Sequence, residues 1–170
     1  LTVLGTGIFN AGGNNITLDS AENQFGTLQL TGNNVVIQEN AATDLGPSTI
    51  GNTLQVTSAG PITDSGTLTV AGTTTLNAGQ SNIILDNAGN QFGTLQLTGN
   101  TVLIQENAAT DLGASNIGNS LQVTSAGPIT DSGNLTVAGL TILDAGLKDI
   151  ILNSAGNQFG TLQLTGNTVL

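Results

Sequence analysis

The sequence predicts an all-β solenoid, and three observations support this fold class. The segment NQFGTLQLTGN occurs unchanged at residues 23–33, 90–100 and 157–167, which sets a 67-residue period. A long fixed period is typical of proteins built from stacked repeats. Short runs of Val, Ile, Leu and Thr alternate with Gly and Asn along the whole chain, as expected of strands joined by tight turns. No stretch carries apolar residues at helical spacing, so no helix is predicted.

The repeats divide the chain into one predicted domain with four parts. Residues 27–93 and 94–160 are complete repeats, and residues 1–26 and 161–170 are partial ones. We therefore expect residues 1–170 to be a single solenoid segment of a longer array. Within residues 27–93, nine strand-like pieces begin at residues 27, 34, 44, 53, 61, 67, 73, 82 and 90. Grouped in threes, they predict three strands per coil and three coils per 67-residue repeat. At a strand spacing of about 4.8 Å, one repeat would advance about 14 Å.

Alternation within the strands predicts which side chains form the core. In the piece TLQL, Leu28 and Leu30 are expected to point inward, and Thr27 and Gln29 outward, because successive side chains of a strand face opposite sides. In the piece NIIL (residues 82–85), the same pattern places Ile83 and Leu85 inside and Ile84 outside. A phenylalanine recurs once per repeat and is expected to fill a wide corner; these residues are Phe25, Phe92 and Phe159.

Composition and charge exclude several classes of function. The chain has a formal net charge of −10, and Lys148 is its only basic residue. Nucleic-acid binding requires Lys and Arg to displace phosphate counterions, so no nucleic-acid partner is expected. No apolar run approaches the roughly 20 residues needed to span a bilayer, so no membrane insertion is expected. Cysteine and histidine are absent, and no cofactor is predicted.

A family likeness is carried by two adjoining segments. Residues 66–79 (GTLTVAGTTTLNAG), followed by residues 82–93 (NIILDNAGNQFG), resemble the central repeats of filamentous-haemagglutinin-like exoproteins. These are very large bacterial proteins exported by two-partner secretion, and the likeness covers essentially the whole chain. The resemblance implies a right-handed parallel β-helix and an extracellular or cell-surface location. It also implies that the repeats form a shaft, while activity often resides elsewhere in such proteins.

Acidic residues recur in register and raise the question of chemistry. The recurring pairs are Asp19 and Asp86, Glu39 and Glu106, Asp44 and Asp111, and Asp64 and Asp131. Paired carboxylates can hydrolyse glycosides, and carboxylates at turns can bind calcium. Here each acid adjoins Gly, Ser or Asn at a predicted corner, where such residues cap turns. We therefore predict a solvated acidic surface, no enzyme activity, and no catalytic, cofactor-binding or metal-binding residue.

Some aliphatic residues occupy predicted outward positions. Val36, Ile84, Leu103 and Ile151 share one outward position of the strands, which Thr17, Thr63 and Thr130 interrupt. Contiguous exposed apolar residues mark interaction sites. If these four align, they form a lateral-contact stripe that packs against another rod. The alternatives are loose alternation, or cover from the long corner at residues 40–48.

The function predicted from the sequence is mechanical. The chain is expected to be the structural shaft of a secreted or cell-surface filament or adhesin, built by coil-on-coil stacking and associating with copies of itself. The alternative is a binding module for calcium, glycan or ice that uses the acidic corners or an outward face. The sequence does not identify a host or cell-surface ligand.

Overall fold

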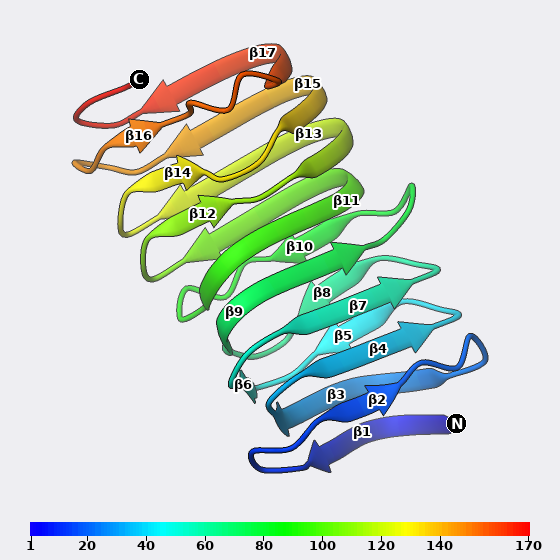
Figure 1. The fold of residues 1–170 in the computed structure, drawn as a ribbon. Coiled ribbons are helices and arrows are strands. Elements are labelled where there is room, and N and C mark those ends of the chain that lie inside the picture. Colours follow the sequence, from blue (N-terminus) through cyan, green and yellow to red (C-terminus); the bar gives the residue numbers. More distant parts are fainter.

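The computed structural model, which describes residues 1–170, is a rod of stacked coils with its two termini at opposite ends (Figure 1). All of its regular structure is β-strand, so it has no helix that could cross a membrane. The strands are β1 (Thr2–Asn10), β2 (Ile16–Leu18), β3 (Gln24–Gly32), β4 (Val35–Glu39), β5 (Thr43–Leu45), β6 (Ser48–Ile50), β7 (Leu54–Ser58), β8 (Ile62–Asp64), β9 (Leu68–Asn77), β10 (Ile83–Leu85), β11 (Gln91–Glu106), β12 (Thr110–Leu112), β13 (Ser115–Ser125), β14 (Ile129–Asp131), β15 (Leu135–Asp144), β16 (Ile150–Ile151) and β17 (Gln158–Thr165). The predicted all-β solenoid is confirmed.

Three strands make one coil, as predicted. Strand β4 pairs with β7, β5 with β8, and β6 with β9, and every pairing is parallel. The coils differ in length because their corners differ. Leu28 pairs with Leu45, whereas Thr2 pairs with Gln24, so the coil that begins at Leu28 is the shorter of the two.

The strands differ from the predicted pieces at one corner in particular. The piece that begins at residue 44 contains two strands, β5 and β6, separated by Gly46 and Pro47. Proline has no amide hydrogen to donate to a strand ladder and is compatible with a corner here. It is not required for the corner, because the next repeat has Ala114 at the equivalent position, between β12 and β13. Two other pieces, beginning at residues 67 and 73, join into the single bent strand β9. The extra corner, at Gly46 and Pro47 in one repeat and at Gly113 and Ala114 in the next, gives each repeat more than nine segments.

The extra segment rotates each repeat relative to the one before it. Stacked residues can be followed coil by coil from Ile16 through Val35 and Leu54 to Thr74. Three coils therefore end at Thr74, short of Ile83, which occupies the place of Ile16 in the next repeat. The coil that begins at Thr74 continues beyond Ile83 to Leu95. Each repeat thus makes three coils and roughly two-fifths of a fourth, somewhat more than the three coils predicted. At the usual strand spacing it advances about 16 Å instead of about 14 Å.

The core is a single cluster of 32 buried residues that runs along the rod. Leu28, Leu30, Ile83 and Leu85 are fully buried, which confirms the predicted alternation. Ladders of this kind remove aliphatic surface from water in every coil, which is the main source of stability in such a fold. Phe25 and Phe92 are buried, and near the N-terminal end the rings of Phe9 and Phe25 meet edge to face, with centroids 5.7 Å apart.

Candidate functional site

The predicted lateral-contact residues do not form one stripe. Ile84 pairs directly with Leu103 in the next coil, so the structure brings these two together. Val36 lies elsewhere, stacked between Thr17 and Gln55. Ile151 lies in a third stack, beside Thr130. The four side chains are half-buried rather than fully exposed.

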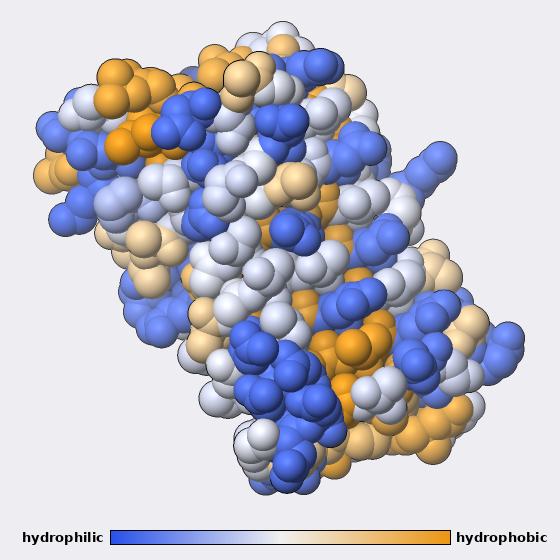
Figure 2. Space-filling view, viewed as in Figure 1, coloured by the Kyte–Doolittle hydropathy of each residue, from blue (hydrophilic) through white to orange (hydrophobic).

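The rotation between repeats explains why these residues separate. Only a whole number of coils per repeat would stack equivalent positions, and the additional part of a coil moves them to different sides. A shorter apolar patch remains, in which Ile142 follows Leu103 after an intervening Gln122. In the view of Figure 2, apolar surface occurs in separate areas between polar ones.

Two recurring aspartates join three successive coils. Asp111 accepts hydrogen bonds from the hydroxyls of Thr94 at 2.8 Å, Thr130 at 3.4 Å and Ser132 at 2.7 Å. Thr94 lies in the coil before Asp111, and Thr130 and Ser132 lie in the coil after it. Asp44 makes the equivalent three bonds in the preceding repeat. These carboxylates therefore tie coils together.

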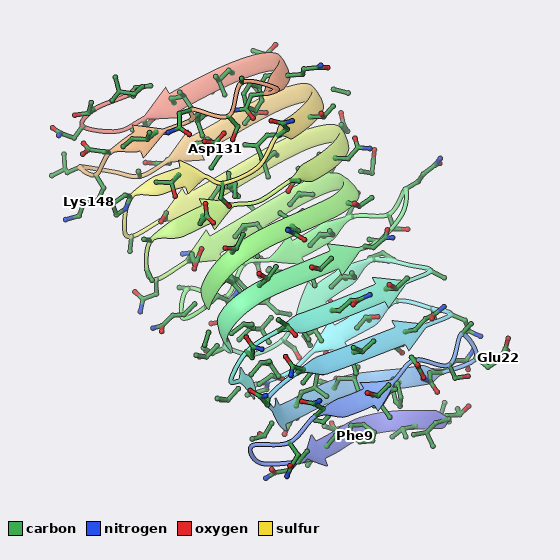
Figure 3. All side chains as sticks on the ribbon, in the orientation of Figure 1. Phe9, Glu22, Asp131 and Lys148 are labelled. Atoms are coloured by element: carbon green, nitrogen blue, oxygen red, sulfur yellow. The ribbon has the colours of Figure 1, made fainter.

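A second pair of aspartates organises the next corner. Asp131 accepts hydrogen bonds from the backbone amides of Asn153 and Ser154 and from the side-chain amide of Asn157. The side-chain oxygen of Asn157 in turn accepts a hydrogen bond from the backbone amide of Leu135 at 2.8 Å. Figure 3 shows Asp131 between the stacked coils. Asp64 makes the same set of contacts in the repeat before.

The two recurring glutamates are buried, so the prediction that all the acids form a solvated surface is wrong. Glu39 is 2% exposed and Glu106 is 3% exposed. Burial raises the pKa of Glu106 to about 7, against the opposing effect of its hydrogen bonds from Thr110 and from the amide of Phe92. Burial also raises the pKa of Glu39. The burial of these glutamates could not be predicted from the sequence, because it depends on contacts between coils. Each glutamate accepts a hydrogen bond from the backbone amide of a phenylalanine in the coil below.

The acidic residues do not gather into a metal centre. No three carboxylate, histidine or cysteine side chains lie together in a way that could hold an ion. Asp19 and Asp86 are exposed, and the amide of Asp86 donates to Asp64. The single basic side chain, Lys148, projects near the C-terminal end of the rod, and Glu22 projects near the other end (Figure 3).

A polar groove lies beside the loop that joins β9 to β10, which projects from the side of the rod (Figure 1). We call it the amide groove. Its volume is about 500 Å³, and it is lined by Gly79, Gln80, Thr98, Gly99, Asn100, Asn116 and Gly118, with no hydrophobic residue among them. These residues come from three successive coils, since Thr98 pairs with Asn77 on one side and with Asn116 on the other.

This groove was not predicted from the sequence, although one signal for it was present. Most lining residues recur with the period of the repeat, but two do not. Gly13 replaces Gln80 in the preceding repeat, and Thr49 replaces Asn116. Departures from a near-perfect repeat can indicate a local role, but their meeting in space depends on coil stacking.

Comparison with known proteins identifies the repeat unit. A family model described as repeats of unknown function (DUF5649) matches the chain at residues 1–31, 32–98 and 98–166. No curated protein and no solved structure matches it. The second matched segment spans one full period of the repeat, and the three together cover nearly all of the chain. The chain therefore belongs to this family of repeats of unknown function.

Proposed function

We propose that this chain is the structural shaft of a secreted bacterial filament or adhesin and has no catalytic role of its own. The observation that carries the proposal is the uninterrupted parallel pairing of coils from β1 to β17 around one continuous core. Each coil contacts only its neighbours, so stability grows with the number of coils, as in other solenoids. Adding coils to such a fold makes the rod longer without making it wider.

The hydrogen bonds made by the aspartate carboxylates support a mechanical role. Asp44, Asp64, Asp111 and Asp131 are occupied by hydrogen bonds between coils. A catalytic acid or base must reach a substrate, whereas these groups are committed to holding neighbouring coils in register. The resemblance of the repeats to filamentous-haemagglutinin-like exoproteins supports an extracellular or cell-surface location and export by two-partner secretion.

Homotypic association is the second part of the proposal. The Ile84–Leu103 pair, with Ile142 beyond it, is the apolar patch available for packing against another rod. Equivalent positions in successive repeats face different sides because each repeat turns by an additional part of a coil. The Ile84–Leu103 patch is therefore confined to one side of the rod and favours lateral association through that side.

Electron microscopy of arrays with increasing numbers of repeats tests the shaft. Each added repeat should lengthen the rod by about 16 Å without widening it. In the cell-bound protein, removal of residues 94–160, one full repeat, should shorten the filament by the same amount. Compact particles, or rods whose length did not follow the number of repeats, would contradict the proposal.

A further inference from the structure

The amide groove has the chemistry of a binding site that the shaft function does not require. Its volume of about 500 Å³ lies within the roughly 300–1,000 Å³ of small-molecule sites. Gln80, Thr98 and Asn116 are exposed, and Asn100 is half-buried. Among these four side chains, Asn100 makes a single weak bond, from its side-chain amide to Asn82 Oδ1 at 3.5 Å. Their remaining donors and acceptors face the groove or solvent.

The lining selects against most classes of ligand. No hydrophobic residue lines the groove, so it offers nothing to a lipid or an aromatic ring. No carboxylate lines it, whereas calcium prefers several carboxylate ligands. The net charge of −10 repels anions at long range. No charged side chain lines the groove to pair with an organic cation or anion, so the lining matches a neutral molecule that both donates and accepts hydrogen bonds along its length.

Primary amides and a hydroxyl can form hydrogen bonds with the hydroxyl groups of a sugar. Each Asn or Gln side chain has an acceptor oxygen and a two-hydrogen donor, and a threonine hydroxyl does both. An amide can therefore accept from one sugar hydroxyl while donating to its neighbour. Glycines at positions 79, 99 and 118 keep the groove open between these side chains. A Cβ on Gly118 would lie 3.6 Å from the Asn100 side-chain oxygen and would narrow it.

The loop that carries Gln80 is held in place before any ligand arrives. Gly79 adopts a positive φ of 57°, which glycine accommodates without strain. The amide of Gly79 donates to Asn77 Oδ1 at 2.9 Å, and the amide of Ser81 donates to the Ala78 carbonyl at 2.8 Å. Ala78 is itself buried in the core. A site on a preformed loop loses less entropy on binding.

We propose that the amide groove binds a neutral oligosaccharide through Gln80, Asn100 and Asn116. The site is specific to the middle repeat, because the first has Gly13 and Thr49 in place of two of these amides and the third has Leu147 in place of Gln80. The shaft would then carry a lateral saccharide contact at one point along its length.

Nuclear magnetic resonance titration of the 170-residue chain tests this directly. The probes are the neutral tetrasaccharides of glucose, mannose and N-acetylglucosamine, with tetragalacturonate as the anionic comparison. At least one neutral probe at up to about 10 mM should shift the side-chain amide signals of Gln80, Asn100 and Asn116. Tetragalacturonate should leave them unchanged. Absence of shifts with every neutral probe, or equal shifts with the anionic one, would overturn the proposal.

The first repeat supplies matched variants that its own fold tolerates. The double variant Gln80→Gly, Asn116→Thr copies the residues at positions 13 and 49, and it should weaken binding by about tenfold or more. The reverse variant, Gly13→Gln with Thr49→Asn, should add a second site and raise the stoichiometry from one to two. Unaltered affinity in the first variant would overturn the proposal even where a saccharide binds. Neither result bears on the shaft, whose rod shape is measured separately.

Discussion

Glu106 accepts a hydrogen bond from the backbone amide of Phe92 at 2.7 Å, which links a buried carboxylate to the coil below it. The second oxygen of Glu106 accepts a hydrogen bond from the hydroxyl of Thr110 at 2.6 Å. No charged group is among the causes of its raised pKa; burial is the largest. In the preceding repeat, Glu39 accepts the amide of Phe25, but its second oxygen has no partner. Each complete repeat thus contains one buried acid whose ionisation opposes folding.

This relationship predicts that Glu106 makes the rod less stable as the pH rises. The pKa of Glu106 is about 7 in the folded protein, against an ordinary value of 4.5. The folded state therefore holds the proton more tightly, and the stability it contributes is present below pH 4.5 and is lost as the pH rises through 7. Glu106→Gln should raise the free energy of unfolding at pH 8 by about 1–3 kcal/mol. Urea denaturation from pH 4 to pH 8 measures the difference.

The control for this prediction is Glu22→Gln, because Glu22 is exposed. It removes the same charge without changing a buried site, so its stability profile should follow that of the unchanged protein. If Glu106→Gln and Glu22→Gln gave the same profile, burial of Glu106 would not be the cause of the pH dependence.

Asp111 provides a second prediction, for the bonds between coils. Asp111→Ala leaves the hydroxyls of Thr94 and Ser132 without their acceptor, and it should lower the free energy of unfolding by about 1–3 kcal/mol. Thermal or urea unfolding measures the loss. The matched control is Asp86→Asn, because the next repeat already has Asn153 at that position. The control should change stability by less than about 0.5 kcal/mol. Equal effects of the two substitutions would argue against a special role for Asp111.

The sequence predicted the core well because alternation within a strand is local. Leu28 and Leu30 could be assigned to the interior from their own neighbours. The additional part of a coil in each repeat could not be obtained in this way, since the corner at Pro47 lies inside what reads as a single strand. The burial of Glu106 and the meeting of Gln80 with Asn116 depend on which residues stack in adjacent coils. Those pairings follow from corner lengths, which the repeat period does not determine.

The ladder of buried leucines gives a third prediction. Leu95 is fully buried and stacks between Thr74 and Leu112. Leu95→Ala should cost about 2–5 kcal/mol, because coils on both sides restrict collapse of the cavity. Leu103→Ala is the control, since Leu103 faces outward and is half-buried; it should cost less than about 1 kcal/mol. A similar loss in both variants would mean that the inward ladder is not the principal source of stability.

Lateral association provides the fourth prediction. Replacing Ile84 and Leu103 by Thr removes apolar surface from two stacked outward positions while keeping good strand formers in place. Rods that bundle through this patch should separate, as seen by electron microscopy or light scattering, with unchanged circular dichroism. The control is Val36→Thr with Ile151→Thr, because those residues lie in other stacks. Bundling that survives the first pair and is lost with the second would place the contact elsewhere.

The recurring glycine of the NQFG segment gives the last prediction, which concerns how closely the coils approach at a corner. A Cβ on Gly93 would lie 2.5 Å from the carbonyl oxygen of Gly72 and 2.7 Å from that of Ala71. Both are backbone atoms, so no side chain can move aside, and Gly93→Ala should destabilise the rod by about 1–3 kcal/mol through forced displacement of the coil below. Gly13→Ala is the matched control, since nothing lies within 4 Å of a Cβ there and its φ is not positive. It should be neutral or stabilising by up to about 1 kcal/mol, because alanine restricts the unfolded chain. If the two substitutions had equal effects on thermal unfolding, close approach would not explain why glycine recurs at this corner.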